Sequence, residues 1–215
     1  YNLDIADFQA QVSGGTEICA DTFATNTITE PSNLGSGSRW SVIEGFATFD
    51  EPTNFNTIAR NVRLGTNTLR WTTVFTDSAQ TCEFNSDIEV VNNTPTLPNA
   101  GANQTVCVDS ADLAANPINN SSGVGIGHWE VAYGNGDFFP DKYAADARVK
   151  NLQANTVNKL MWVAVNESCR LEDSMYVSSY EVTANAGTDE SVCDDVHNLD
   201  ASLDAGETGT WQVIP

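Results

Sequence analysis

The strongest constraint on how this chain can fold is an internal repeat. Residues 101–107 (GANQTVC) return as residues 187–193 (GTDESVC), 86 positions later. Residues 14–19 (GGTEIC) form a weaker copy, whose cysteine lies 88 positions before Cys107. A fixed period of this size indicates one structural unit that is used several times along the chain. The fold must therefore be that of a unit of fewer than 100 residues.

Other landmarks keep the same spacing. A Gly-rich turn leads into a tryptophan after each repeated cysteine, at Trp40, Trp129 and Trp211. A second tryptophan precedes a second cysteine in two of the copies, as Trp71 before Cys82 and Trp162 before Cys169. We therefore expect three domains, which are residues 1–97, residues 98–183 and the truncated start of a third repeat at residues 184–215.

Each unit has the sequence pattern of β structure. Thr, Val, Asn, Ser and Gly are frequent, and no segment keeps a helical apolar stripe. In the second unit, short apolar runs between turn residues predict a strand before Cys107 and further strands at residues 111–115, 127–133, 147–152, 158–165 and 175–183. About seven short strands in such a unit favour an all-β fold in which two sheets pack as a sandwich.

The order Cys, Trp, Cys within a unit resembles that of immunoglobulin domains. The cysteines form no CxxC motif and have no histidine at zinc-site spacing, so a disulfide framework is favoured over a metal site. The immunoglobulin-like spacing leads us to expect one disulfide in each sandwich, Cys19–Cys82 and Cys107–Cys169, closing one pole of the sandwich. Cys193 would then pair with a cysteine beyond residue 215. Disulfides indicate an oxidising compartment outside the cytoplasm.

Charge and hydropathy exclude several classes of function. The formal net charge is −20, so nucleic acids and anionic lipid surfaces would repel the chain. No apolar segment is long enough to span a membrane, and the first residues show neither an initiator Met nor a signal peptide. We therefore expect the chain to be a processed piece or a fragment of a longer protein.

Residues 184–193 (ANAGTDESVC), 199–201 (LDA) and 206–211 (GETGTW) closely resemble the repeats of giant surface proteins of the Bacteroidota. The chain is similar to gliding-motility adhesins of the SprB type, which the type IX secretion system exports. This resemblance implies tandem immunoglobulin-like or PKD-like domains in an extended rod on the outer cell surface. It also implies anchoring to the cell envelope or to motility machinery, and contact with a surface or polysaccharide. An alternative stays open, in which the repeats are spacer or carbohydrate-binding modules of a secreted glycan-degrading enzyme.

The sequence offers no catalytic machinery and no cofactor motif. Its two histidines, His128 and His197, stand at non-equivalent positions of the repeat, so we predict that the chain is not an enzyme. One acidic cluster near residue 190 could hold a calcium ion between domains. Its members are Asp189, Glu190, Asp194 and Asp195. The equivalent stretch of the second unit keeps only one carboxylate, so a solvated acidic face is the preferred interpretation.

Two further groups of residues are candidate surface sites. Three serines stand in the Asp-Ser-apolar pattern of Bacteroidota O-glycosylation, at Ser78, Ser110 and Ser174, although Asp-Ser is also ordinary turn chemistry. The five regularly spaced tryptophans are expected to fill the sandwich cores. Less regular aromatics are the place to look for a ligand, namely Phe46, Phe49, Tyr133, Phe138, Phe139 and Tyr143.

Overall fold

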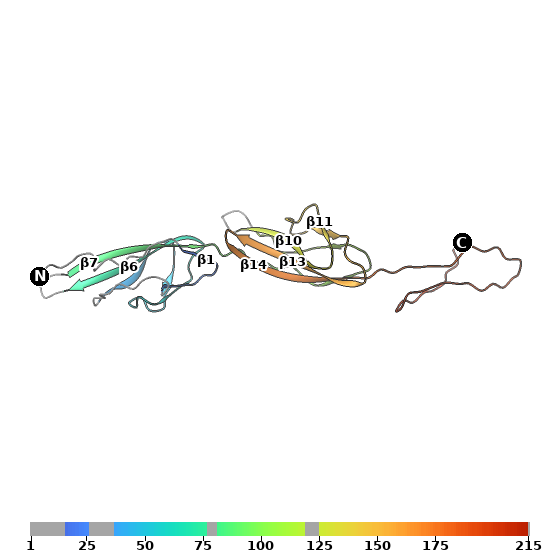
Figure 1. Cartoon of the computed structure of the whole chain (residues 1–215), viewed down its shortest axis with the longest axis horizontal. Helices are drawn as coiled ribbons and strands as arrows, with labels where there is room; N and C mark the ends of the chain where they lie inside the picture. Colours follow the sequence, from blue (N-terminus) through green and yellow to red (C-terminus); the bar gives the residue numbers. More distant parts are fainter. Residues whose placement is uncertain (1–15, 26–36, 77–80, 119–124, 215) are drawn as a thin grey trace. The chain divides into compact units, whose positions relative to one another are not determined.

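The computed structural model describes residues 16–25, 37–76, 81–118 and 125–214 (Figure 1). These residues form β-strands and no α-helix. The first repeat contributes seven strands, β1 Thr16–Ile18, β2 Phe23–Ala24, β3 Arg39–Glu44, β4 Thr48–Phe49, β5 Ile58–Arg60, β6 Gly65–Thr76 and β7 Thr81–Asn92. The second also contributes seven, β8 Gln104–Val106, β9 Ala111–Asp112, β10 Ile126–Tyr133, β11 Asp137–Phe139, β12 Arg148–Lys150, β13 Thr156–Asn166 and β14 Cys169–Ser179.

The two sets of strands pair in the same way. The first repeat has a four-stranded sheet in the order β1-β7-β6-β3 and a three-stranded sheet in the order β2-β5-β4. The second repeat has the corresponding sheets β8-β14-β13-β10 and β9-β12-β11. In each repeat the first short strand runs parallel to the last long strand, with Ile18 beside Asn92 and Val106 beside Ser179. Each repeat is therefore an immunoglobulin-like β-sandwich, which confirms the predicted all-β fold class.

Buried and exposed residues alternate along the long strands, and the buried ones form the core of each sandwich. In β7, Ile88 and Val90 are buried, while Asp87 before them and Glu89 between them are exposed. The buried cluster of the first repeat takes side chains from both sheets, with Phe23 and Ala59 on one side and Trp71 with its neighbours on the other. Burial of such large apolar side chains is the main source of stability for a small β domain.

Four of the five repeated tryptophans lie in these cores, as predicted. Trp40, Trp71, Trp129 and Trp162 each expose 3% or less of their surface. Trp40 Nε1 donates to Phe55 O at 3.0 Å, and the equivalent Trp129 Nε1 donates to Ala144 O at 3.1 Å. The repeat thus reproduces hydrogen bonds as well as strands.

The prediction is wrong for the fifth, Trp211, which is 55% exposed. Trp40 packs against Trp71 of the long strand β6. The described residues 184–214 hold only an isolated bridge between Asn185 and Ser202, and no strand equivalent to β6. Trp211 therefore lacks the surface against which its counterparts pack.

A buried asparagine and a glycine form a second repeated element. Asn67 at the start of the long strand β6 is fully buried. Its side-chain Oδ1 accepts a hydrogen bond from Phe46 N at 3.0 Å. Its Nδ2 donates to Arg63 O at 2.7 Å and to Gly65 O at 2.9 Å. Gly45 has a φ of +85°, and a Cβ added there would overlap Asn67 Oδ1. Asn158 and Gly134 form the same pair in the second repeat. The sequence needs glycine here both for the backbone conformation and for the close approach of the amide.

Strand boundaries agree with the sequence prediction in the middle of the second repeat and differ at its ends. The predicted strand at 127–133 is β10, and the one at 158–165 lies within β13. The last strand, β14, begins at Cys169 rather than at residue 175 and ends at Ser179. The short strand β11 was not predicted, because three residues are too few to show a period.

Spatially, the chain divides into two compact units. The first contains the N-terminal repeat together with residues 115–128 and residues 162–173, and the latter range carries Cys169. The second contains residues 100–114, 129–161 and most of the C-terminal segment. The domain boundaries proposed from the repeat period, at residues 97 and 183, stay a prediction.

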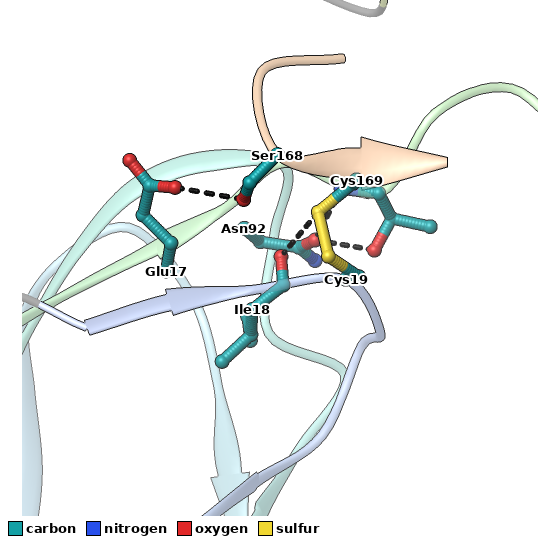
Figure 2. The surroundings of a disulfide bond; sticks show 7 residues. Glu17, Ile18, Cys19, Asn92, Ser168 and Cys169 are labelled. Atoms are coloured by element: carbon teal, nitrogen blue, oxygen red, sulfur yellow. Dashed lines mark hydrogen bonds between the residues drawn. A yellow bond between two sulfur atoms is a disulfide. The ribbon is translucent and has the colours of Figure 1, made fainter. Parts of the chain in front are cut away.

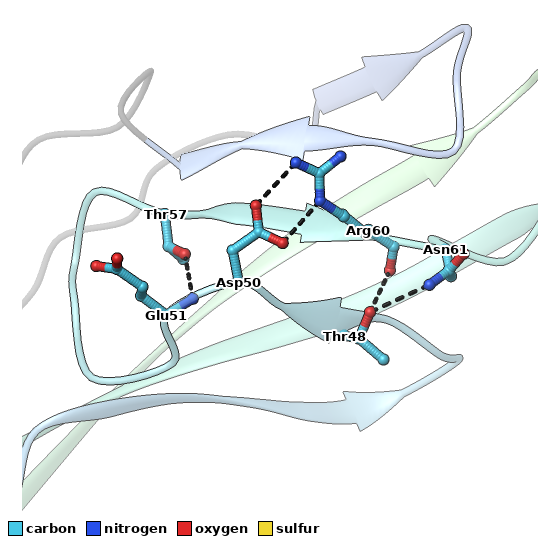
Figure 3. Close-up of polar contacts among 6 residues, drawn as sticks. All are labelled: Thr48, Asp50, Glu51, Thr57, Arg60 and Asn61. Carbon is cyan, nitrogen blue, oxygen red and sulfur yellow. Dashed lines mark hydrogen bonds and ion pairs between the residues drawn. The ribbon is translucent and has the colours of Figure 1, made fainter.

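Surface carboxylates are paired with arginines on both sheets of the first repeat. Asp50 accepts two hydrogen bonds from Arg60, at 2.7 and 2.9 Å, and Thr48 and Asn61 continue this polar network (Figure 3). On the other sheet, the Arg70 guanidinium donates to both carboxylate oxygens of Asp87, at 2.6 and 2.7 Å. These hydrogen bonds lower the pKa of Asp87 and of Asp50 below their ordinary values.

The Arg70–Asp87 pair predicts a pH dependence that can be measured. Because the folded-state pKa of Asp87 is depressed, its contribution to stability is present above the unfolded-state pKa of about 4 and is lost as the pH falls through the lower folded-state value. Both side chains are partly exposed, so the contribution at neutral pH is at most about 0.5 kcal/mol. Denaturant titrations should show Arg70→Met less stable than wild type at pH 7 and equal to it at pH 2. A difference that persists at pH 2 would assign the effect to packing instead.

Candidate functional site: the disulfide between two repeats

The most distinctive covalent feature of the described chain is a disulfide that connects the two repeats. Cys19 follows β1 in the first repeat and bonds to Cys169, the first residue of β14 in the second, across 150 positions of sequence (Figure 2). Their Cα atoms are 5.3 Å apart, within the usual range for a disulfide. Both cysteines belong to the first compact unit.

The predicted pairings Cys19–Cys82 and Cys107–Cys169 are therefore wrong. Strand β1 runs parallel to β7, with Ile18 beside Asn92, so Cys19 lies just past the last residue of β7. Cys82 is the second residue of that strand, ten positions earlier. At about 3.3 Å per residue, some ~33 Å separates the two ends. The same parallel register holds in the second repeat, where Val106 lies beside Ser179 at the end of β14. Cys107 is therefore separated from Cys169 by the length of that strand.

The predicted pairing is wrong because it requires both cysteines of a unit to lie at the same pole of the sandwich. The second cysteine instead begins the last strand, and the first cysteine lies where that strand ends. Each sandwich therefore carries one cysteine at each pole, and a disulfide forms only between different repeats.

Polar contacts surround the disulfide. Ser168 Oγ donates to Glu17 Oε2 at 3.0 Å, and Cys169 Sγ lies 3.5 Å from Ile18 O (Figure 2). Ser168 lies in the turn between β13 and β14, and Cys169 begins β14. The sequence pointed to the cysteines but gave no signal for Glu17 or Ser168.

Hydrogen bonds also hold the backbone that presents Cys19. Asn93 N donates to Ile18 O at 2.9 Å, so the segment after β7 continues the pairing with β1. Asn92 Nδ2 donates to Val62 O at 2.7 Å, and Asn92 Oδ1 accepts from Thr94 N at 2.9 Å. The end of the sheet and the connecting segment therefore both fix the position of the backbone at Cys19.

This arrangement has a mechanical consequence. A covalent bond between the repeats keeps them joined when non-covalent contacts yield, since breaking it requires reduction rather than a fluctuation. Such a bond persists only under oxidising conditions. The site is therefore a structural cross-link suited to an extracytoplasmic protein.

The remaining cysteines are unbonded. Among the described residues, Cys82, Cys107 and Cys193 are free thiols, and all three are exposed. The predicted partner of Cys193 beyond residue 215 stays a prediction.

The three predicted glycosylation serines lie in different environments. Ser78 falls outside the described residues. Ser110 is half-buried in the segment before β9, and its hydroxyl accepts from Arg148 Nη2 at 2.9 Å. Ser174 is half-buried within strand β14. The structure does not bring these serines together.

The aromatic candidates separate into two groups. Phe49 and Phe138 occupy equivalent positions and stack on Trp40 and Trp129, at centroid distances of 5.9 and 6.1 Å, so they belong to the repeated core rather than to a variable surface. The other four are largely exposed, namely Phe46, Tyr133, Phe139 and Tyr143. Two have a lysine beside the ring, with Lys150 Nζ 4.4 Å from the Phe139 centroid and Lys142 Nζ 5.3 Å from that of Tyr143.

The acidic cluster of the C-terminal segment is exposed. His197 Nε2 lies 2.8 Å from Glu190 Oε2. Asp189, Asp194 and Asp195 are solvent-accessible, and nowhere in the described ranges do three or more potential metal-ligating side chains converge.

The described part of the chain has no helix of the length and apolarity needed to cross a membrane.

No family model and no curated protein matches the chain. Among solved structures, extracellular domains 3–5 of Drosophila OTK match with 12% identity and a TM-score of 0.39, over 77% of this chain and 58% of that one. The insect immune protein hemolin matches with 10% identity and a TM-score of 0.41, over 80% of this chain and 46% of that one.

A third structure is BT4661, a SusE-like surface located polysaccharide binding protein from Bacteroides thetaiotaomicron, with 10% identity and a TM-score of 0.31, over 80% of this chain and 34% of that one. This chain thus spans less than two thirds of each of these three structures. The assignment of the sandwich fold rests on the strand order and the core described above.

Proposed function

We propose that this chain is a structural and adhesive segment of a very long cell-surface adhesin, similar to the gliding-motility adhesins that the type IX secretion system exports. The observation that carries the proposal is the disulfide Cys19–Cys169, which joins two copies of one sandwich. Repeated domains with a covalent bond between them suit a tether that carries load outside the cell. In this proposal the domains are residues 1–97, 98–183 and 184–215, arranged as an extended rod.

Charge supports the same proposal. A net charge of −20 keeps separate rods soluble and apart, and it disfavours polyanionic partners. The partners proposed are therefore a surface or polysaccharide, contacted through other parts of the parent protein, and the cell-envelope anchor or motility machinery. No catalytic role and no cofactor is part of the proposal. O-glycosylation at Ser78, Ser110 or Ser174 would fit the proposed export route, and intact-mass measurement of the native protein would detect the sugars.

The experiment that tests this function uses the source organism. Antibodies raised against the 215-residue chain should label intact, unpermeabilised cells, and deletion of the gene should abolish attachment or surface movement. The native polypeptide should contain many further copies of the Cys/Trp repeat in peptide mapping. Labelling only after permeabilisation would contradict the proposal. A catalytic domain next to one or two repeats would favour an enzyme's spacer instead.

A carbohydrate-binding function is the second candidate, and the exposed aromatics favour it. Phe139 and Tyr143 are 59% and 58% exposed, each with a lysine near its ring. Exposed aromatic faces stack on sugar rings. If the second repeat binds polysaccharide, Tyr143→Ala should reduce its retardation in polysaccharide-containing native gels. Tyr176→Ala is the matched control, because Tyr176 is also exposed and also lies near a lysine, Lys159. Equal mobility of both variants and wild type would exclude this binding site.

A further inference from the structure

The pole of the second repeat that carries Cys107 has the same backbone geometry as the pole that carries Cys19. Tyr180 N donates to Val106 O at 2.9 Å, just as Asn93 N donates to Ile18 O at 2.9 Å. Cys107 follows Val106 as Cys19 follows Ile18, and both preceding strands pair in parallel with the last strand of their sandwich. Cys107 is therefore presented as Cys19 is, but its thiol is unbonded.

The connecting segment beside Cys107 is exposed, whereas the equivalent segment beside Cys19 is buried. Next to the bonded Cys19, the connecting residues Asn93 and Pro95 are buried. Their equivalents beside Cys107, Tyr180 and Val182, are 51% and 62% exposed. Cys107, Val108, Tyr180 and Val182 line a cavity of about 360 Å³. Asp109 and Glu181 lie at the same cavity, so the hollow beside the Cys107 thiol has both apolar and acidic walls, and it is open at the position where the first repeat has a formed joint.

The complementary half of such a joint is also free. Cys82 is the second residue of β7 and Cys169 is the first residue of β14, so each stands at the start of the last long strand of its sandwich. Thr81 precedes Cys82 and pairs with Thr76 of β6, whereas Ser168, whose hydroxyl donates to Glu17, lies in the turn before Cys169. Cys82 is exposed and unbonded.

We propose that the face around Cys107 binds the hairpin turn of another repeat of this kind, and that Cys107 forms a disulfide there with the hairpin cysteine of that repeat. Cys82 holds the corresponding position at the start of β7 in the first repeat, so in this proposal it is the cysteine that bonds to a face of the same kind on another repeat. We expect another repeat as the partner because the joint already present is of this kind. There, Cys19 is bonded to Cys169, which follows the turn between β13 and β14 of a second sandwich. Every repeat would then be cross-linked at both poles.

The bond forms by thiol–disulfide exchange with a small-molecule disulfide as the oxidant. One cysteine thiolate attacks the small disulfide, which gives a mixed disulfide and releases one small thiol. The second cysteine thiolate attacks the protein sulfur of that mixed disulfide and releases the second small thiol. Two protein thiols are thereby oxidised, the small disulfide is reduced to two thiols, and these take up the two protons.

Two full-length variants, both with Cys193→Ser, provide the test. Cys82→Ser keeps only the Cys107 half of the joint, and Cys107→Ser keeps only the Cys82 half. They are mixed in equal amounts in a buffer of oxidised and reduced glutathione, with enough NaCl to screen the repulsion between these acidic chains. Non-reducing electrophoresis and peptide mapping then count the Cys82–Cys107 heterodimer and the two homodimers.

We expect the heterodimer to exceed each homodimer by about tenfold or more, because only the heterodimer recreates the native joint. Random collision of exposed thiols gives one, two and one parts of the three species, and that result would overturn the proposal. Absence of any Cys82–Cys107 peptide would overturn it as well. The experiment uses purified protein, so its outcome is independent of whether the proposed function at the cell surface is correct.

Discussion

Replacing Cys169 by Ser is expected to lower the thermal unfolding midpoint of the full chain by roughly 10 °C under non-reducing conditions. The disulfide spans 150 positions, and on the chain-entropy model closing such a loop stabilises the folded state by up to about 5 kcal/mol. Differential scanning calorimetry of the purified chain measures this directly. Adding a reducing agent should produce the same decrease in wild type and no further decrease in the variant.

Cys107→Ser is the matched control for that experiment. Cys107 occupies the position equivalent to Cys19 but is exposed and unbonded, so its replacement should leave the midpoint unchanged within about 1 °C. If Cys107→Ser lowered the midpoint as much as Cys169→Ser, the two residues would be partners and the described joint would be wrong.

Replacing Asn67 by Ala is expected to destabilise the first repeat by about 2–4 kcal/mol. The side chain is fully buried and satisfies Phe46 N, Arg63 O and Gly65 O. Alanine would leave these backbone groups without partners in a space too small for full hydration. Denaturant unfolding followed by tryptophan fluorescence should show the loss, and Asn158→Ala should have a similar effect on the second repeat.

Asn85→Ala provides the comparison for Asn67→Ala. Asn85 lies on the neighbouring strand β7 and is exposed, where it accepts one hydrogen bond from Thr72 Oγ1 at 2.7 Å. Its replacement should change stability by less than about 0.5 kcal/mol. Equal effects of the two substitutions would mean that the Asn67 network does not stabilise the sandwich.

The architecture could be predicted because its signals are repeated. Copies of the same Cys and Trp positions at a fixed period define a unit, and apolar alternation within the unit defines strands that bury one face. Trp40 and Trp129 were correctly placed in the cores for this reason. The buried Asn67 and Asn158 also recur before a tryptophan in the sequence, so their repetition was visible, although nothing local indicated the glycine that each contacts.

The pairing of the cysteines could not be obtained in this way. It depends on whether the first short strand runs parallel or antiparallel to the last one, and strand periodicity is the same in both cases. Cys19 and Cys82 share a unit in sequence but lie at opposite ends of β7. The exposure of Trp211 likewise depends on a missing neighbour strand rather than on its own repeat position.

The most direct test of the central claim is peptide mapping of the full chain under non-reducing conditions, with free thiols alkylated before digestion. For the monomeric chain, the account predicts one disulfide-linked peptide pair containing Cys19 and Cys169, with Cys82 and Cys107 recovered in alkylated form. Recovery of Cys19 linked to Cys82, together with Cys107 linked to Cys169, would contradict it and restore one separate disulfide to each sandwich.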